Sequence, residues 1–266
     1  MAKRRMPDGI RALDLDGLRP NTMEIIAGRE GECQSRLAFS SGTERLLEVD
    51  AEGKPGYGEA MHTLVEHPLL QHRLALLRAA DTGTKLFRQL VREMTHFLAF
   101  EALRDLPTRP VTVRTPMGEA AGAKLAGHLV VAPILRAGLG MLDAMLEILP
   151  LATAGVIGIR RNEETAEPIP YYLNLPKAHP DSIVVLADPM LATGGSACDA
   201  IAALKANGFR RIVFLNLISC PDGLARLDRE HPDVPVYTAA IDPVLDSRHY
   251  IVPGLGDAGD RLFGTL

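Results

Sequence analysis

The 266-residue sequence contains only three cysteines, and their arrangement does not suit a disulfide framework or a metal site. Cys33, Cys198 and Cys220 are odd in number and widely spaced, and no CxxC pair occurs. The eight histidines are scattered, without an HExxH motif or a His/Cys cluster, so we do not expect a structural zinc site. This cysteine usage favours a reducing, cytoplasmic compartment.

The sequence also lacks an apolar run long enough to cross a membrane. Its most apolar stretch, residues 128–159, is interrupted by Arg136, Asp143, Glu147 and Pro150. The basic first six residues are followed by alternating charged and apolar residues, not by the apolar core of a signal peptide. A net charge of −4 and a pI near 6.1 provide no bulk attraction to nucleic acids or acidic membranes. We therefore expect neither as a partner.

Residues 183–196, IVVLADPMLATGGS, lack the lysine of GxxxxGK[ST] and the spacing of GxGxxG, which argues against a nucleoside triphosphate or a dinucleotide here. They read as a buried strand, then Asp188, then a loop that ends in two glycines. Adjacent glycines remove the Cβ atoms that would keep backbone N–H groups away from a phosphate. Asp188 is placed to bind sugar hydroxyls, so the stretch predicts a ribose 5-phosphate site. An ordinary strand-to-helix turn is the alternative.

Strands that alternate with helices predict an α/β fold with a mostly parallel, twisted sheet flanked by helices on both faces. The expected strands are residues 128–132, 155–159, 183–187, 212–218 and 234–239. The expected helices begin at Pro68, at Thr84, after Gly140, at Ala197 with Ser196 as its N-cap and Gly208 as its C′ residue, and at Pro221.

Two hairpins and an N-terminal extension complete the predicted organisation. Residues 111–119 look like a short hairpin, and residues 160–175 like a long protruding one. Residues 1–60 show mixed charge and no sustained period, so we interpret them as a partly ordered or arm-like extension of a domain at residues 61–266.

Ligands of parallel sheets bind at the carboxyl ends of the strands, where further charged segments are expected. Arg136, in PILRAGLG, is a lone cation in a turn after a strand and suits a diphosphate. A surface arginine paired with a nearby carboxylate is the alternative. Arg160 and Arg161, in IRRNEET, lie on the long hairpin, which reads equally well as a lid over a charged substrate or as a solvated loop.

The last segment, HYIVPGLGDAGD, combines three glycines and a proline with Asp257 and Asp260. Such a loop presents backbone N–H and C=O groups that can read the edge of a planar base. A glycine-rich terminal turn without a ligand is the alternative.

Four segments together carry a family resemblance: ADPMLATGGS, PILRAGLG, RRNEETAEP and YIVPGLGDAGDRLFGT. In order and spacing they resemble the uracil phosphoribosyltransferases, from about Val65 to Leu266. The resemblance implies a type I phosphoribosyltransferase fold with a protruding β-hairpin. It also implies conversion of uracil and 5-phospho-α-D-ribose 1-diphosphate (PRPP) to UMP and diphosphate with Mg²⁺, a homo-oligomer, and in many bacterial members activation by GTP.

Carried over motif by motif, the resemblance implies the site residues. Arg136, Asp188 and Asp257 are the expected catalytic residues. Uracil is expected at Ile251, Gly256, Asp257 and Ala258. PRPP is expected at Arg136, Arg161, Asp188, Pro189, Met190, Leu191, Ala192, Thr193, Gly194, Gly195, Ser196 and Asp257. Many phosphoribosyltransferases have two adjacent acidic residues where this chain has Asp188 and Pro189, so no protein ligand is assigned to the magnesium ion.

Two other functions are compatible with the same motifs. One is a different base specificity or a nucleotide-binding regulator of the same fold, such as the pyrimidine operon attenuators, which bind RNA. It predicts a basic face and a steep dependence of binding on salt. The other is a scaffold that has lost catalysis, although no motif residue is missing.

Overall fold

The computed structural model describes residues 22–24, 34–38, 44–49, 55–56, 62–161 and 168–265, with side chains from residue 62 onward except those of 160, 161 and 168. The chain divides into two compact units, Met1–Glu59 and Ala60–Leu266. The described part of the first unit is an antiparallel sheet in the order β1 (Thr22–Glu24), β2 (Gln34–Ala38), β3 (Glu44–Val49) and β4 (Pro55–Gly56).

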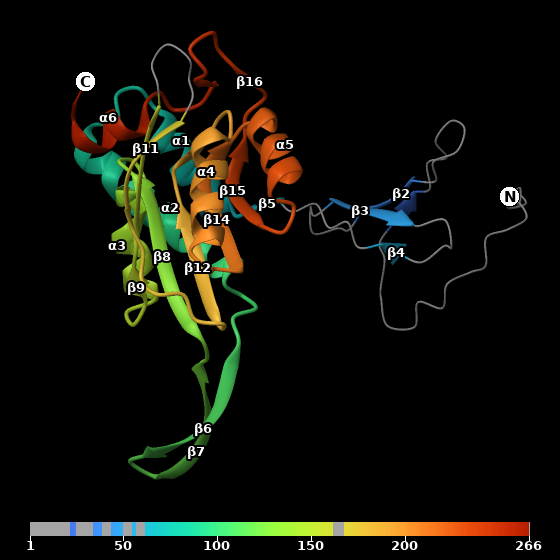
Figure 1. Cartoon of the computed structure of the whole chain (residues 1–266), viewed down its shortest axis with the longest axis vertical. Coiled ribbons are helices and arrows are strands. Elements are labelled where there is room, and N and C mark those ends of the chain that lie inside the picture. The colour runs from blue at the N-terminus through green and yellow to red at the C-terminus, as the bar shows by residue number, and fades with distance from the viewer. Residues whose placement is uncertain are drawn as a thin grey trace, which may run out of the picture. The chain divides into compact units, whose positions relative to one another are not determined.

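The second unit is built around a nine-stranded sheet in the order β11-β10-β8-β12-β14-β15-β5, with β9 beside β8 and β13 beside β14 (Figure 1). All pairs are parallel except β10 with β11, which confirms the mostly parallel sheet. The strands are β5 (His62–Leu64), β8 (His128–Leu135), β9 (Thr153–Ala154), β10 (Val156–Arg161), β11 (Pro168–Asn174), β12 (Ser182–Ala187), β13 (Met190–Leu191), β14 (Arg211–Ser219) and β15 (Val236–Ile241).

Helices cover both faces of this sheet, as predicted. Helices α1 (Pro68–Arg78), α2 (Thr84–Ala102), α3 (Leu139–Ile148) and α6 (Ala258–Phe263) pack on one face, and α4 (Gly195–Ala206) and α5 (Pro221–Glu230) on the other (Figure 1). Strand β12 is buried throughout because Val185 faces the first group while Val184 and Leu186 face the second. No described helix is long and apolar enough to cross a membrane.

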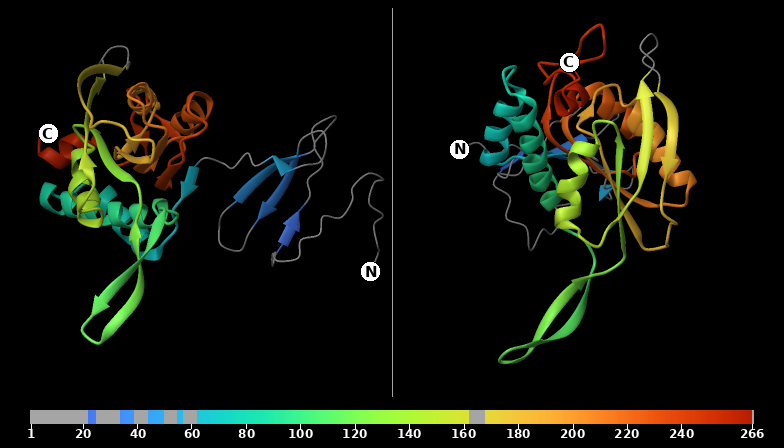
Figure 2. Two further views of the ribbon diagram at one scale, coloured as in Figure 1. Left: turned by 60° about the horizontal axis from the view of Figure 1, so that its bottom comes forward. Right: turned by 90° about the vertical axis from the view of Figure 1, so that its left-hand side faces the viewer.

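The hairpin predicted around residues 111–119 is longer than expected. Its strands, β6 (Thr108–Thr115) and β7 (Gly118–Leu125), have eight residues each and pair along their whole length. The hairpin extends away from the sheet in all views (Figures 1 and 2). Most of its residues are exposed, so no buried face marks where its strands end.

The hairpin predicted at residues 160–175 corresponds to β10 and β11, which pair antiparallel from Val156 with Asn174 to Arg161 with Pro168. Its turn, including most of the IRRNEET motif, lies outside the described residues. A further small pair, β16 (Val244–Leu245) with β17 (Ile251–Val252), leads into the last glycine-rich loop.

Candidate active site

A cavity of about 1040 Å³ lies at the carboxyl ends of β8, β10 and β12. Its walls come from residues 134–137, 190–197, 247–251 and 256–260, together with Ile159, Tyr171 and Asp188. Three of the four segments expected at this edge of the sheet therefore line one cavity. The fourth reaches it through Ile159 of β10, whereas the side chain of Arg161, the last residue of β10, lies outside the described part of the chain.

The glycine pair after β12 starts helix α4 two residues earlier than the sequence suggested. Gly194 is the N-cap, with a left-handed backbone (φ 79°, ψ −8°), and Gly195 is the first helical residue. The prediction that Ser196 caps the helix is therefore wrong, because a left-handed glycine ends the loop before the serine is reached. The first N–H groups of α4, at Gly195, Ser196 and Ala197, have no partner within the helix and lie at the cavity wall. They form an anion-binding helix start.

Asp188 and Pro189 have different positions relative to the cavity. Asp188 directly follows β12, lines the cavity, and donates its backbone N–H to the carbonyl of Leu215 (3.1 Å). Pro189 is buried and does not line the cavity. Its carbonyl accepts hydrogen bonds from the amides of Leu217 (2.9 Å) and Ile218 (3.1 Å), which fixes the start of the phosphate loop against β14.

Arg136 lies just after β8 at the mouth of the cavity, with 59% of its side chain exposed. Its Nη2 is 3.5 Å from Oδ1 of Asp260, and its guanidinium is 5.9 Å from the ring of Phe263. The sequence left open a diphosphate partner or an arginine paired with a carboxylate; the structure shows the carboxylate contact and places Arg136 at the cavity wall. Because the pair is exposed, it is weak and can yield to a more highly charged ligand.

The last glycine-rich loop leads from β17 into α6 and is closely constrained. Gly254 (φ 54°) and Gly256 (φ 80°) have left-handed backbones, and the Val252–Pro253 peptide is cis. Asp257 caps α6, its Oδ1 accepting a hydrogen bond from the amide of Asp260 (2.8 Å). The hydroxyl of Tyr250 lies 3.4 Å from the other carboxylate oxygen of Asp257. Asp257 is thereby oriented at the cavity wall.

Asp242 is hydrogen-bonded to this loop but does not line the cavity, and nothing in the sequence identified it. Its carboxylate accepts hydrogen bonds from Arg78 and from the backbone amide of Gly254. Burial alone would raise the pKa of Asp242, but the hydrogen bonds and the charge of Arg78 outweigh it and hold that pKa below its ordinary value. Asp242 is therefore ionised near neutral pH.

The residues of the β16–β17 turn also line the cavity, and of these the sequence had placed only His249, the first residue of the last segment, in the site. Ser247, Arg248 and His249 belong to this group, and His249 has a positive φ of 62°. The carboxylate of Asp246 accepts hydrogen bonds from the amides of Arg248 and Tyr250 (2.8 Å each). An aspartate that bonds the amide two residues on is an Asx turn, the one sequence signal that was available.

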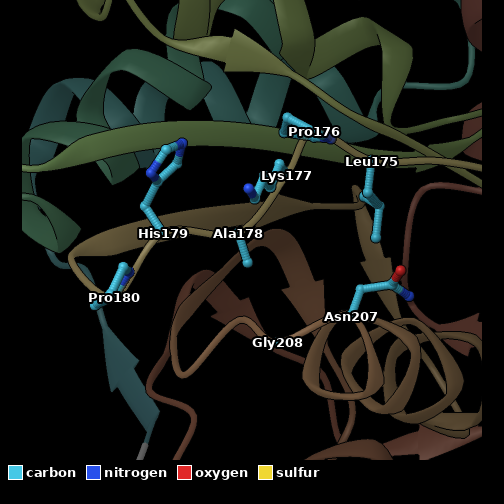
Figure 3. A pocket seen from close by; sticks show the side chains of 8 residues that line it. All are labelled: Leu175, Pro176, Lys177, Ala178, His179, Pro180, Asn207 and Gly208. Carbon is cyan, nitrogen blue, oxygen red and sulfur yellow. The ribbon is translucent and has the colours of Figure 1, made fainter.

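A second hollow of about 620 Å³ is formed by residues 175–180 with Asn207 and Gly208 (Figure 3). It lies at the C-terminal end of α4 and the start of β12, away from the carboxyl ends of the strands. No predicted site residue lines it. We therefore assign the ligand site to the larger cavity.

The architecture and the cavity first define a class: an α/β protein that binds a phosphorylated ligand at the carboxyl ends of a parallel sheet. Its cavity joins a glycine-rich helix start, a carboxylate after a strand and an arginine in the adjacent turn. Within residues 62–161 and 168–265, no three His, Cys, Asp or Glu side chains gather as a metal site.

Comparison with known proteins then defines the family. The family model for uracil phosphoribosyltransferase matches residues 64–265. The uracil phosphoribosyltransferase of Thermoanaerobacter sp. (strain X514) is 50% identical over 203 residues, covering 76% of this chain and 97% of the relative. That of Dictyoglomus thermophilum is 52% identical over 206 residues, covering 77% and 100%. The solved structure of the AQ2163 protein from Aquifex aeolicus is 37% identical, with a TM-score of 0.73 over 76% of this chain and 97% of that one.

The chain therefore belongs to the uracil phosphoribosyltransferase family, and its enzyme class is that of the phosphoribosyltransferases. The resemblance read from the four motifs is confirmed. The matched range begins within β5 and leaves the first unit outside the family's common part.

Proposed function

We propose that this protein converts uracil and PRPP to UMP and diphosphate within the cavity at the carboxyl ends of the sheet. One observation carries the proposal: the helix start of α4, Arg136 and the loop at residues 251–258 line a single cavity. These are the three kinds of surface that a sugar phosphate, a diphosphate and a planar base require.

The donor is expected to bind with its 5-phosphate at the amides of Thr193, Gly194, Gly195 and Ser196, where the helix dipole favours an anion. Asp188 accepts hydrogen bonds from the ribose hydroxyls. Arg136 and Arg161 bind the diphosphate. Residues 189–192 shape the loop: Met190, Leu191 and Ala192 line the cavity, and Pro189 anchors it.

Loss of diphosphate leaves positive charge on the anomeric carbon and negative charge on the leaving group. Arg136 is expected to stabilise the negative charge, and the carboxylates of Asp188 and Asp257, which line the same cavity, the developing positive charge. Mg²⁺ typically binds one or two carboxylates together with substrate phosphates, and Asp188, Asp257 and Asp260 can supply them. A bound Mg²⁺ would neutralise part of the diphosphate charge.

Uracil is expected to bind main-chain groups at Ile251, Gly256, Asp257 and Ala258, which all line the cavity. A backbone N–H only donates and a backbone C=O only accepts a hydrogen bond, so a loop held in one conformation presents a fixed pattern of donors and acceptors. We expect this pattern to match O4, N3 and O2 of uracil and to reject cytosine, whose N3 and N4 reverse it.

Three further properties belong to the same proposal. The β6–β7 hairpin exposes Val113 and Leu125 on its strands and Met117 in its turn, which suits contact with a second copy in a homo-oligomer. Cys198 and Cys220 are buried free thiols, in keeping with a reducing, cytoplasmic location. GTP is proposed as an activator, which rate measurements with and without GTP will test.

An assay of UMP formation from uracil and PRPP with Mg²⁺ tests the proposed reaction. We expect turnover by the full chain and a fall in kcat/KM of about 100-fold or more for Arg136→Met, because a charged contact to the leaving group is lost. The absence of turnover in the unaltered protein would refute the proposal. Tight, salt-sensitive RNA binding in its place would favour the regulator.

A further inference from the structure

The loop expected to read the base is held from outside the cavity by an ion pair. Arg78 is the last residue of α1, and its Nη1 and Nη2 donate hydrogen bonds to the two carboxylate oxygens of Asp242 (2.5 and 2.7 Å). The same Nη1 donates to the carbonyl of Gly254 (2.8 Å), whose amide donates to Asp242 (2.8 Å). The pair thus binds both backbone groups of Gly254.

A second arginine holds the next residue of the loop. Arg261 of α6 is 9% exposed, and its Nη1 donates to the carbonyl of Leu255 (2.8 Å). Its Nη2 donates to the carbonyl of Ala79 (2.6 Å), and its guanidinium lies 4.4 Å from the ring centre of Phe87. The carbonyls of two successive loop residues are therefore engaged on the side facing α1 and α2.

The backbone of this loop needs such external support. A Cβ on Gly254 would lie 2.0 Å from the carbonyl oxygen of Ile251, so the turn is as tight as a glycine permits. Glycines with positive φ, here Gly254 and Gly256, readily adopt other conformations when nothing constrains them. The ion pair supplies the constraint, and the C-terminal end of α1 favours the positive charge of Arg78.

We propose that Arg78 and Asp242 are positioning residues for base recognition. Their ion pair sets the orientation of the main-chain groups at residues 251–258 that select uracil. This inference rests on the proposed role of that loop. Neither side chain lines the cavity, so both act through Gly254.

The inference predicts a separation between the two substrates. The helix start of α4 and Arg136, which are expected to bind PRPP, make no contact with this ion pair in the described hydrogen bonds. Asp257, the expected PRPP residue within the loop, is fixed separately by the hydrogen bond that it accepts from the amide of Asp260 (2.8 Å). Disrupting the pair should therefore raise the KM for uracil and weaken rejection of cytosine, while the KM for PRPP stays near its original value. A residue that only stabilised the fold would not separate the two constants.

The experiment uses the full chain with Arg78→Met, Arg78→Lys and Asp242→Asn. The matched control is Arg73→Met, because Arg73 lies on the same helix, pairs with Glu93 at 2.5 Å, and has a side-chain exposure of 26% against 23% for Arg78. Initial rates are measured while uracil and PRPP are varied separately, and cytosine is tested as a competing acceptor. Thermal unfolding of each variant is recorded in parallel.

For Arg78→Met we expect the KM for uracil to rise about ten-fold, the KM for PRPP to change less than about two-fold, and the control to keep both. Arg78→Lys keeps the charge but not the paired geometry, so its rise should be smaller. If Arg78→Met does not fold, Arg78→Lys and Asp242→Asn decide. Both constants rising together, or the control showing the same rise, would overturn the inference. An inactive unaltered protein would refute the proposed function itself.

Discussion

At the scale of single residues, the site depends on a close approach of two backbone segments. Gly138 follows the turn that carries Arg136, and a Cβ at this position would lie 2.4 Å from the carbonyl oxygen of Ala187 and 2.6 Å from that of Ile134. Both oxygens are backbone atoms close to site residues, Ala187 just before Asp188 and Ile134 just before the turn with Arg136. They cannot move aside without displacing those residues. The absent side chain thus brings the arginine turn against the end of β12.

Gly138→Ala is expected to destabilise the fold through this contact alone. Gly138 has a right-handed backbone (φ −58°, ψ −21°), which alanine adopts without strain, so the cost is steric. We expect a loss of about 2 kcal/mol of unfolding free energy and a fall in Tm of about 5 °C.

Gly122→Ala is the matched control, because a Cβ there makes only ordinary contacts of 3.7 Å and longer, the nearest with the Val111 side chain. Its unfolding free energy should change by less than about 0.5 kcal/mol. Equal effects of the two substitutions in thermal unfolding would show that the contact at Gly138 does not govern stability.

At the scale of elements, α1 is joined to the C-terminal loop by charge as well as by packing. The carboxyl of Asp242 has a pKa below its ordinary value of 3.8, because hydrogen bonds from Arg78 and the Gly254 amide outweigh the effect of burial. A lowered pKa means that the contribution to stability is present above pH 3.8 and is lost as the pH falls through the folded-state value.

Asp242→Asn should therefore lower the unfolding free energy by about 2 kcal/mol near neutral pH, since a charged hydrogen-bond acceptor is removed. The difference from the unaltered protein should shrink below about pH 4, because the native carboxyl is then protonated as well. Urea unfolding at a series of pH values measures this. A difference that stays constant or grows on acidification would contradict it.

The sequence predicted most of the elements but not the contacts that hold the loop. Helix α5 begins at Pro221 as predicted, because a proline at the first helical position is a local signal. The ion pair of Arg78 with Asp242 joins positions 164 residues apart, and nothing local marks either as a partner of the other. The start of α4 was misplaced for a similar reason, because the left-handed backbone of Gly194 depends on its fit beside Gly223.

At the scale of the whole molecule, the described site lies entirely within the second unit. The cavity is lined by residues between Ile134 and Asp260, and the family match covers residues 64–265. Strand β5 at residues 62–64 pairs with β15 and completes the edge of the nine-stranded sheet. A functional boundary should therefore fall before His62 and near the division between Glu59 and Ala60.

A protein that starts at Ala60 is accordingly expected to fold and to form UMP, with a kcat/KM within about two-fold of the full chain. It keeps β5, which pairs with β15, so the backbone groups of β15 at the sheet edge do not become exposed. A protein that starts at Val65 serves as the comparison, because it lacks β5 and should unfold at a lower temperature.

Rates with and without GTP, measured on both the full chain and the Ala60 form, separate the roles of the first unit. Normal folding with lost turnover would place part of the catalytic machinery in residues 1–59, whereas lost GTP response alone would make that unit regulatory.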